Sequence, residues 1–247
     1  MVGKSLNIIY GRKPVENLIK SKNRKIKRIF LLKNFSDNNI ITLINRKEIK
    51  TELVTVEELN RLTSNRNHQG IVAEVEGEFK YTELDELLQK VENKDNSTLV
   101  ILDGIEDPVN FGSIIRTSSC FSVDGIIISK NRQVQVTSTV SKVATGAEEY
   151  VPICRVTNLN QTIATLKKNG FWIVTTDGWA KTLYTDVDYN GKIAVIIGSE
   201  GKGASKLVAS NSDFVVKIPI SGPITSLNAS IACAIVLAQI TNYRLKK

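Results

Sequence analysis

The segment LVILDGIEDPVNFGSIIRTSSCFSVDGIII, residues 99–128, contains two apolar runs separated by a helical pattern. The runs at 99–102 and 125–128 are short and uncharged, which is typical of fully buried strands. Between them, residues 111–121 follow the apolar spacing of a helix. A strand, a helix and a strand in this order form the unit from which parallel sheets are built. The segment therefore predicts an α/β domain.

The same alternation continues to the end of the chain. Further strands are expected at 150–153, 171–175, 193–197 and 214–218, and further helices at 139–146, at 159–168, after Gly203 and from Leu227. Apolar strands separated by helices indicate a mostly parallel sheet that is covered on both faces. This part of the chain is thus expected to form the larger of two α/β domains.

The first 77 residues show a second, shorter alternation. Strands are predicted at 29–32, 51–54 and 71–76, and helices near 14–20, 38–46 and 56–62. The stretch that follows is polar and acidic, with one short amphipathic run at 84–91, and it reads as a linker. We therefore predict a small α/β domain at 1–77, a linker at 78–97 and the larger domain at 98–247.

Length and composition exclude several classes of protein. A chain of 247 residues that is 42% hydrophobic can bury a core and is not mainly disordered. Cys120, Cys154 and Cys233 lie far apart among apolar neighbours, which indicates reduced thiols rather than a disulfide scaffold or a zinc site. The longest apolar run, 231–240, is about half as long as the roughly 20 residues of a membrane-spanning helix. Because the N-terminus also lacks the pattern of a secretory signal, we expect a cytoplasmic protein, and we expect no metal site.

The net charge of +8 is concentrated in the first domain. Residues 1–77 contain 15 basic and 8 acidic residues, whereas the predicted linker is acidic. Seven basic residues follow one another with no acid between Glu16 and Asp37: Lys20, Lys22, Arg24, Lys25, Lys27, Arg28 and Lys33. Such a run is often only a solvated face, but this one continues into the apolar strand predicted at 29–32. We interpret it as a docking surface for a polyanion, with nucleic acid as the favoured partner.

The glycine-rich segment GSEGKG, residues 198–203, does not match the usual nucleotide-binding loops. A phosphate-binding loop would have a lysine and then a serine or threonine after Gly203, where Ala204 and Ser205 stand. No G-x-G-x-x-G pattern opens the first strand-helix unit either. Both observations argue against an ATPase and against an ordinary dinucleotide-binding enzyme.

Three other segments lie where predicted strands end, which is where open α/β sheets bind their ligands. They are LDGIEDPVNFGSIIRT at 102–117, IGSEG at 197–201 and IPISGPITSLNAS at 218–230. Together they resemble the SpoU (TrmH-like) family of knotted RNA ribose 2′-O-methyltransferases, and most of all the branch that modifies a guanosine of large-subunit rRNA. The segments IYG at 9–11 and HQGI at 68–71 resemble the family's N-terminal RNA-binding domain, so the resemblance covers essentially the whole chain.

This resemblance implies a reaction, a cofactor and a site. The reaction is methyl transfer from S-adenosylmethionine to the 2′-hydroxyl of a guanosine in 23S rRNA, with the cofactor held in a deep trefoil knot and a homodimer formed through the last helix. The implied catalytic residues are Asn110, Arg116, Glu200, Ser226 and Asn228. The implied cofactor-binding residues are Thr176, Gly178, Gly198, Ile218 and Leu227. The expected RNA-binding residues are Arg12, Lys13, Lys22, Arg24, Lys25, Lys27 and His68.

The chemistry of the reaction suggests what Arg116 does. A ribose hydroxyl is a poor nucleophile near neutral pH, so an enzyme must position it and stabilise its developing negative charge. The arginine matching Arg116 is proposed in the family to take the proton from this hydroxyl. A guanidinium accepts a proton only when it is deprotonated, and its pKa is above about 12. We therefore expect Arg116 to orient a phosphate and to stabilise the oxyanion, and we leave the role of general base as the weaker alternative.

Each of these residues also has a simpler structural interpretation. Glu200 could be a loop acid at a helix N-terminus, and Ser226 and Asn228 could be caps of the last helix. Ile218 and Leu227 could be ordinary core residues, and His68 could be a structural hydrogen-bonding group. Lys13 stands where the family commonly has histidine, which leaves the choice of substrate open.

Other functions remain alternatives at this point. Within the same class, the chain could modify a tRNA guanosine or an rRNA adenosine. In a different class, it could be a non-catalytic RNA-binding factor, which its basic first domain alone would permit. The set of Asn110, Arg116, Glu200 and Asn228 favours an enzyme, because a protein that only binds RNA has no need of all four.

Overall fold

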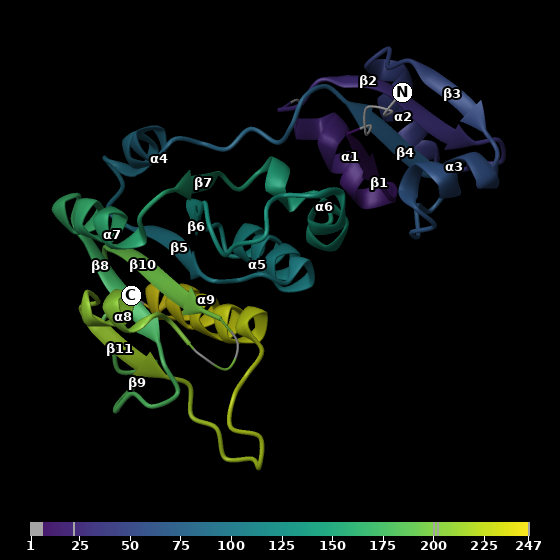
Figure 1. Cartoon of the computed structure of the whole chain (residues 1–247). Helices are drawn as coiled ribbons and strands as arrows, with labels where there is room; N and C mark the ends of the chain where they lie inside the picture. Colours follow the sequence, from purple (N-terminus) through teal and green to yellow (C-terminus); the bar gives the residue numbers. More distant parts are fainter. Residues whose placement is uncertain (1–6, 22, 200, 202, 247) are drawn as a thin grey trace. The chain divides into compact units, whose positions relative to one another are not determined.

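The computed structural model describes residues 7–21, 23–199, 201 and 203–246, which form two compact units (Figure 1). Unit 1 consists of Met1–Lys80 together with Val136–Tyr150, and unit 2 consists of Tyr81–Gln135 together with Val151–Lys247. Each unit has its own sheet. The expected α/β class with two sheets is therefore confirmed.

Unit 2 is built on a seven-stranded sheet with the order β7-β6-β5-β10-β8-β11-β9. Every neighbouring pair in it is parallel, as predicted from the alternation of apolar strands and helices. The strands are β5 (Ser97–Asp103), β6 (Gly125–Ser129), β7 (Ile153–Val156), β8 (Phe171–Thr176), β9 (Thr182–Leu183), β10 (Lys192–Gly198) and β11 (Phe214–Lys217). The central residues of β5, β6, β8 and β10 are fully buried, because helices cover both faces of a parallel sheet.

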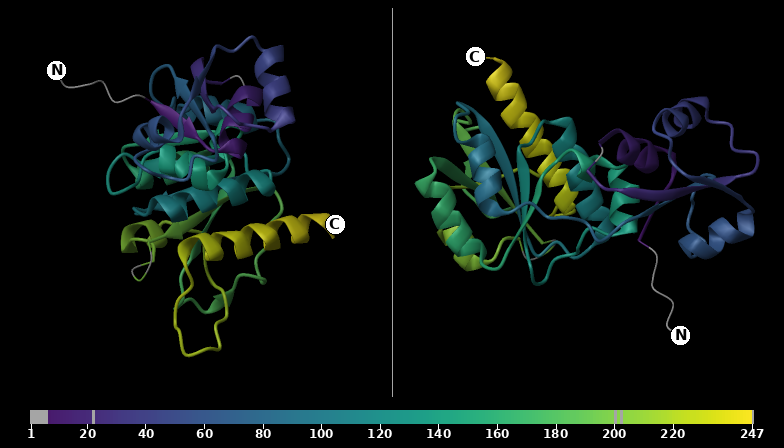
Figure 2. Two further views of the ribbon diagram at one scale, coloured as in Figure 1. Left: turned by 90° about the vertical axis from the view of Figure 1, so that its right-hand side faces the viewer. Right: turned by 90° about the horizontal axis from the view of Figure 1, so that it is seen from above.

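Helices pack on the two faces of this sheet (Figure 2). On one face, α4 (Leu84–Val91), α7 (Leu159–Lys168) and α8 (Lys206–Ser210) share a core with alternate residues of β5, β8 and β10. Elsewhere, α9 (Ala229–Leu245) packs against α5 (Pro108–Cys120) and against β10. Helix α5 begins after Asp107, whose carboxylate accepts from the amide of Asn110, and has proline as its first residue. These local signals fix where the helix after β5 starts.

The order of the strands creates a switch point in the sheet. From β5 the chain moves outward to β6 and β7, and then returns to β8 on the other side of β5, with β10 between them. Two neighbouring crossovers that run in opposite directions leave a crevice at the carboxyl ends of the strands. A ligand site is expected there. The trefoil knot implied by the family resemblance stays a prediction.

Several predicted boundaries in unit 2 were wrong, for local reasons. The helix expected at 111–121 begins three residues earlier, at Pro108, because Asp107 is its N-cap. The strand expected at 150–153 lies at Ile153–Val156, because the preceding Ala147–Glu149 forms a short 3-10 helix that belongs to unit 1. The last helix begins at Ala229 rather than at Leu227, because Asn228 is its N-cap. The two-residue strand β9 was not predicted, since a pattern of two residues carries no periodicity.

Unit 1 contains a four-stranded sheet with the order β1-β4-β2-β3, in which only β2 and β3 are parallel. Apolar clusters lie on both faces of this sheet. Its elements are β1 (Ile8–Tyr10), α1 (Arg12–Ser21), β2 (Ile26–Leu32), α2 (Asn38–Arg46), β3 (Thr51–Val54), α3 (Val56–Thr63) and β4 (Ile71–Val75). Helix α6 (Ser138–Ala144) completes the unit, although it lies between β6 and β7 in the sequence. The domain limits predicted from charge, 1–77 and 98–247, stay a prediction and did not foresee this arrangement.

The three cysteines are free thiols, and two of them are buried. Burial raises the pKa of the Cys154 and Cys233 thiols to about 12, so neither is a thiolate near neutral pH. Within the described ranges, no helix combines the length and the apolar character that crossing a membrane would require.

Candidate functional site

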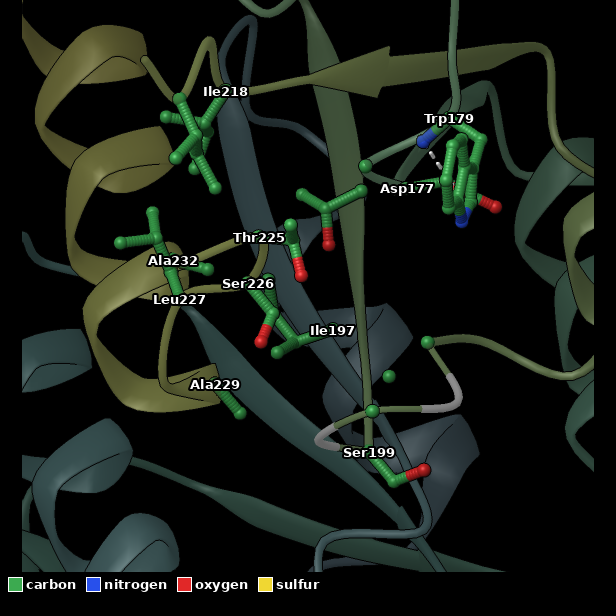
Figure 3. Close-up of a pocket in the computed structure, with 16 residues that line it drawn as sticks. Asp177, Trp179, Ile197, Ser199, Ile218, Thr225, Ser226, Leu227, Ala229 and Ala232 are labelled. Carbon is green, nitrogen blue, oxygen red and sulfur yellow. Dashed lines mark hydrogen bonds between the residues drawn. The ribbon is translucent and has the colours of Figure 1, made fainter. Parts of the chain in front are cut away.

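A cavity lies at the carboxyl ends of β8, β10 and β11, beside the start of α9 (Figure 3). All five residues predicted to bind a cofactor line it: Thr176, Gly178, Gly198, Ile218 and Leu227. Residues from three segments far apart in the sequence are thus brought together at the switch point of the sheet. Ser226, which was predicted to be catalytic, lines the same cavity.

The walls of this cavity are mixed in character. Ile197, Ile218, Leu227, Ala229 and Ala232 supply apolar surface, which suits a flat base and a short aliphatic chain. Hydroxyl groups of threonine and serine also line it, and the loop from β11 to α9 extends away from the sheet (Figure 1). A cavity with apolar walls and a few polar groups is typical of a site for a small amphipathic molecule.

A tight turn after β8 forms the rim. Asp177 accepts a hydrogen bond of 2.8 Å from the amide of Trp179 through its side chain, and its own amide donates to the carbonyl of Val216. The turn leaves the side chain of Trp179 95% exposed at the edge of the cavity. Sequence reasoning missed Trp179 and Asp177. Their only sequence signal was that they flank Gly178, directly after a buried strand.

Gly198 is required by the close return of the chain after β10. A Cβ atom at this position would lie 2.0 Å from both the backbone N of Ala204 and the backbone C of Gly203. The return is held by a hydrogen bond of 2.9 Å from the amide of Gly203 to the carbonyl of Ser199. Gly178 is different, because a Cβ there would meet no atom within 4 Å. One glycine is therefore needed by the fold, and the other leaves open space in the cavity.

We expect Gly198→Ala to lower the free energy of unfolding by about 3 kcal/mol, since two backbone atoms would have to move. Gly178→Ala is the matched control and is expected to change it by less than about 0.5 kcal/mol. Urea denaturation of both variants measures the difference. Equal losses of stability would contradict the distinction between the two glycines.

A second cavity, of about 570 Å³, lies next to the first. Ser199 and Gly203 line both cavities, and the loop 103–110 supplies much of the second one. Asp103 is used to hold this loop, because its carboxylate accepts from the amide of Ser205 at 2.8 Å. Asp107 caps α5. The carboxylate of Glu106 is exposed and lines the cavity together with Asn110.

Asn110 and Asn228 join the starts of two helices. The side-chain amide of Asn228 donates to Oδ1 of Asn110 at 2.7 Å. Its own Oδ1 accepts from the amides of Ser230 and Ile231 and so caps α9. The interpretation of Asn228 as a cap is thus confirmed, and the same side chain also binds Asn110, which lines the second cavity. Ser226 is exposed and does not cap the helix.

The two remaining predicted catalytic residues are placed less directly. Arg116 is exposed on α5, six residues after Asn110, so the two side chains point about 120° apart around the helix. Within the described residues, Arg116 forms no salt bridge and lines neither cavity. Glu200 lies outside the described residues. The structure therefore brings Asn110, Asn228 and Ser226 together, but it does not bring Arg116 to them.

Comparison with known proteins places this geometry in a family. Residues 97–238 match the model described as the SpoU rRNA Methylase family. The chain belongs to this family. Residues 8–80 of this SpoU-family chain also match a model described as RNA 2′-O ribose methyltransferase substrate binding.

Relatives and solved structures agree with this assignment. YacO of Bacillus subtilis, named for the TrmH family of tRNA/rRNA methyltransferases, is 38% identical over 96% of this chain and 95% of its own length. A protein of the same family name from Staphylococcus epidermidis is 41% identical over 96% of both chains. The SpoU methyltransferase AviRb of Streptomyces viridochromogenes, solved in complex with AdoMet, has a TM-score of 0.82 at 20% identity, over 97% of this chain and 91% of its own. An AdoMet-bound rRNA methyltransferase of Sinorhizobium meliloti has a TM-score of 0.79 at 24% identity, over 96% and 87% of the two chains. These structural likenesses show that the SpoU-family fold is shared.

The basic residues of unit 1 are not all presented to solvent. Lys13, Lys25 and Lys27 are exposed cations that each form an ion pair with a nearby glutamate. The ammonium groups stay accessible to solvent in these pairs, so a phosphate can replace the glutamate as their partner. Arg12 is half exposed, lies over the ring of Phe35 and is 3.9 Å from Asp37. Lys22 lies outside the described residues.

Arg24 differs from the expected solvent-facing cation. Its side chain is only 9% exposed, and it forms ion pairs with the carboxylates of Glu148 and Glu149. A buried guanidinium must be paired, because an uncompensated charge in the interior is costly. Arg24 is therefore held inside unit 1 of this SpoU-family chain. Its guanidinium is therefore not available to contact RNA, unlike the exposed lysines of unit 1.

His68 uses both of its ring nitrogens within unit 1. Nδ1 accepts from the amide of Gly70 at 3.0 Å, so Nε2 carries the hydrogen and donates to Oδ1 of Asn60 at 3.2 Å. Burial, together with the positive charge of Lys142, lowers the pKa of His68 below the ordinary value of 6.5. This arrangement favours the structural role. An RNA contact for His68 stays a prediction.

The lowered pKa of His68 predicts how stability depends on pH. Because the unfolded chain holds the proton more tightly than the folded chain, the contribution of His68 is present above pH 6.5 and is lost as the pH falls through that value. We expect the free energy of unfolding to fall between pH 7 and pH 5. In a His68→Gln variant, this part of the fall should be absent, since His68 is the only histidine. Identical pH profiles for the two proteins would contradict the assignment.

Proposed function

We propose that this chain transfers a methyl group from S-adenosylmethionine to the 2′-hydroxyl of a ribose in RNA, a guanosine of 23S rRNA. The observation that carries the proposal is the position of the first cavity. It is lined by all five predicted cofactor residues and shares Ser199 and Gly203 with the second cavity, which Asn110 lines. Unit 1, which matches an RNA-binding model, supplies the docking surface.

The residues of the first cavity fit S-adenosylmethionine. Ile218 and Leu227 supply the apolar surface that an adenine ring needs, and Thr176 and Ser226 add hydroxyl groups. The open space at Gly178 lets a ligand approach the main chain closely. The cofactor, when bound, supplies a methyl group activated by a positively charged sulfur.

The chain's own residues would position the ribose and stabilise charge. Asn110 and Asn228 lie at the starts of α5 and α9, where the helix dipoles and backbone amides favour negative charge. Their amide side chains are held by each other at 2.7 Å and can orient the ribose hydroxyls at the junction of the cavities. Arg116, which lines neither cavity, would orient the neighbouring phosphate and stabilise the oxyanion from whichever copy of the homodimer proposed below supplies it. The proton of the 2′-hydroxyl passes to solvent.

The second cavity supports guanosine as the target. A cavity of about 570 Å³ can hold a nucleoside, and Glu106 presents a carboxylate in it. Guanine offers N–H donors on its Watson–Crick edge, and a carboxylate is an acceptor that suits them. Adenine presents one acceptor on that edge and fits less well. A tRNA guanosine and an rRNA adenosine remain the alternative substrates.

We also propose a homodimer that forms through α9. Val109 on α5 and Ile231 on α9 are about half exposed, although both belong to helices that otherwise bury apolar residues. Covering such residues against a second copy would remove apolar surface from water. A monomeric mass by light scattering at micromolar concentration would contradict this part of the proposal.

The decisive test is methylation of total RNA with labelled S-adenosylmethionine, followed by mapping of the modified nucleotide. The proposal expects the label on the ribose of one guanosine in 23S rRNA. A label on a base nitrogen would overturn it. A non-catalytic RNA-binding factor is the alternative from a different class, and failure to bind S-adenosylmethionine at millimolar concentration in calorimetry would favour it.

Gly178→Ala separates cofactor binding from folding. The added methyl group would occupy space that the fold leaves open, so we expect about tenfold weaker binding of S-adenosylmethionine with unchanged stability. The exposed Trp179 provides the signal, measured by fluorescence in a Trp172→Phe background that contains one tryptophan. Unchanged affinity would place the cofactor elsewhere.

A further inference from the structure

The segment Val136–Tyr150 crosses from one unit to the other and back. It lies in sequence between β6 and β7, which are neighbouring strands of the unit 2 sheet, yet its residues pack in unit 1. The chain therefore passes between the units three times, after Lys80, after Gln135 and after Tyr150. The backbone therefore joins this segment to unit 2 at both of its ends, whereas a single linker would join the two units only once.

A buried ionic cluster anchors this segment in unit 1. Nε of Arg24 donates to Glu149 at 2.6 Å, and its Nη2 donates to Glu148 at 3.2 Å. The two carboxylate side chains are essentially inaccessible to solvent. Ser21 also donates to Glu149 at 3.0 Å, so three elements of the chain meet at one carboxylate. These contacts connect the end of α1, the residue Arg24 just before β2 and the 3-10 helix.

Contacts along α1 extend the anchor. The side-chain amide of Asn17 donates to the carbonyl of Thr145 at 2.8 Å. Gly146 has a φ of +82°, and a Cβ atom there would lie 2.8 Å from Cβ of Asn17 and 3.1 Å from Cα of Pro14. Near the middle of the segment, Lys142 donates to Gln69 at 2.8 Å. Because Gly146 packs so closely against Asn17 and Pro14, the segment cannot shift along α1.

Gln133 and Val134, just before the segment, bind the turn that leads from β5 into α5, where Asn110 lies. The amide of Ile105 donates to Oε1 of Gln133 at 3.1 Å, and the amide of Val134 donates to the carbonyl of Ile105 at 3.0 Å. Both Ile105 and Gln133 are buried. Val134 precedes the first residue of the anchored segment by only two positions. The backbone of the loop 103–110 is thus held by the same stretch of chain that is anchored in unit 1.

We propose that Val136–Tyr150 is a coupling segment, through which the RNA-docking unit sets the geometry of residues 103–110, which run from the end of β5 into the first turn of α5, where Asn110 lies. The inference rests on the proposed function of that loop. Gln133 is its positioning residue in unit 2, and Glu149 is its positioning residue in unit 1. The segment makes the geometry of residues 103–110 depend on an intact docking unit. The coupling runs from the hydrogen bonds between Ile105 and residues 133–134, along the backbone through α6, to the anchor at Glu148 and Glu149, rather than through the cofactor cavity.

The two neighbouring glutamates provide a matched pair of variants. Glu148→Gln keeps the shape of the side chain and removes the carboxylate that lies farther from Arg24, at 3.2 Å, so Glu149 remains as the counter-charge of the guanidinium. Glu149→Gln leaves Arg24 without its closest counter-charge and puts a donor where Ser21 donates. Gln133→Met removes the acceptor for the amide of Ile105 without touching unit 1. The last variant keeps the proposal testable if Glu149→Gln fails to fold.

The experiment measures the single-turnover rate of methyl transfer at saturating RNA and cofactor, with the dissociation constants of both. We expect Glu149→Gln and Gln133→Met each to lower the rate by about tenfold or more, and Glu148→Gln to stay within about twofold. The affinity for S-adenosylmethionine should stay within about twofold in all three. The double variant Glu149→Gln with Gln133→Met should be no slower than the slower single variant, since both act on one path. Multiplying effects, or an unchanged rate in a folded Gln133→Met, would overturn the coupling.

Hydrogen exchange separates this inference from the proposed function. In Glu149→Gln, the amides of peptides covering 103–110 should exchange faster than in the native chain, whereas Glu148→Gln should leave them unchanged. This result does not require methyl transfer, so it stands even if the substrate is wrong. Exchange that changes only in unit 1 would show that Glu149 is structural there and has no influence on the loop.

Discussion

Replacing Arg116 with alanine is expected to lower the single-turnover rate of methyl transfer by about 100-fold to 1000-fold. This is the usual cost of losing one group that stabilises a developing oxyanion. Because Arg116 does not line the first cavity, the dissociation constant of S-adenosylmethionine should change by less than about twofold. Because it is exposed, the free energy of unfolding should also stay the same. Filter binding with labelled cofactor and RNA measures rate and affinity in the same preparation.

Two further variants make this prediction specific. Arg116→Lys keeps the charge but loses the planar fork that binds a phosphate through two hydrogen bonds, so it should recover only part of the rate. Lys168→Ala removes an exposed cation from α7 and is expected to be silent. Full activity in Arg116→Lys would exclude both the phosphate contact and the role as base. If Lys168→Ala lowered the rate of methyl transfer as much as Arg116→Ala does, the effect would come from the overall positive charge and not from Arg116 itself.

The second large effect is expected in RNA affinity. Changing Lys13, Lys25 and Lys27 to glutamine removes three exposed cations from unit 1. For every RNA phosphate that is no longer neutralised, the slope of log affinity against log salt should decrease in magnitude by about 0.7 to 0.9. We therefore expect a slope that is smaller by about 2 to 3 and an affinity about 100-fold weaker near 0.1 M salt. Fluorescence anisotropy with an rRNA fragment over a salt series provides the measurement.

The control for this variant removes the same charge from unit 2. Lys90, Lys94 and Lys167 are also exposed and paired with acids, so their triple change to glutamine has a matched chemistry. It should leave the salt slope within about 0.5 of the native value. Arg24→Gln should instead lower stability, because its partners are buried carboxylates. Equal slopes for the two triple variants would contradict docking through unit 1.

Much of unit 2 could be predicted because its local signals agree with one another. The runs 99–102 and 125–128 are too apolar to lie anywhere except a covered sheet, and they occupy β5 and β6. Asp107 and Pro108 mark the start of α5 as a cap and a first-turn proline should. The cavity residues were found through a family resemblance. The periodicity of apolar residues would not have identified Gly178, because this glycine matters for the open space that it leaves in the cavity.

Other features depended on interactions between distant parts of the chain. The pattern of 139–146 predicted a helix correctly, but nothing in that pattern indicates that α6 packs in unit 1. The basic run predicted Arg24 as a surface cation, because charge alone does not show that Glu148 and Glu149, more than 120 residues later, surround it. For the same reason the strand at 150–153 was misplaced by three residues.

The residues that could hold a cofactor were found through the family resemblance. The sequence by itself determined the parallel sheet of unit 2 and the excess of positive charge in the first 77 residues. These properties follow from short-range patterns of apolar and charged residues, which are local in the chain. Only the tertiary structure decided that Asn110 meets Asn228, that Arg24 is buried and that Val136–Tyr150 packs in unit 1. Each of these depends on groups more than 100 residues apart, and their pairing is fixed by packing and by the need to compensate buried charge.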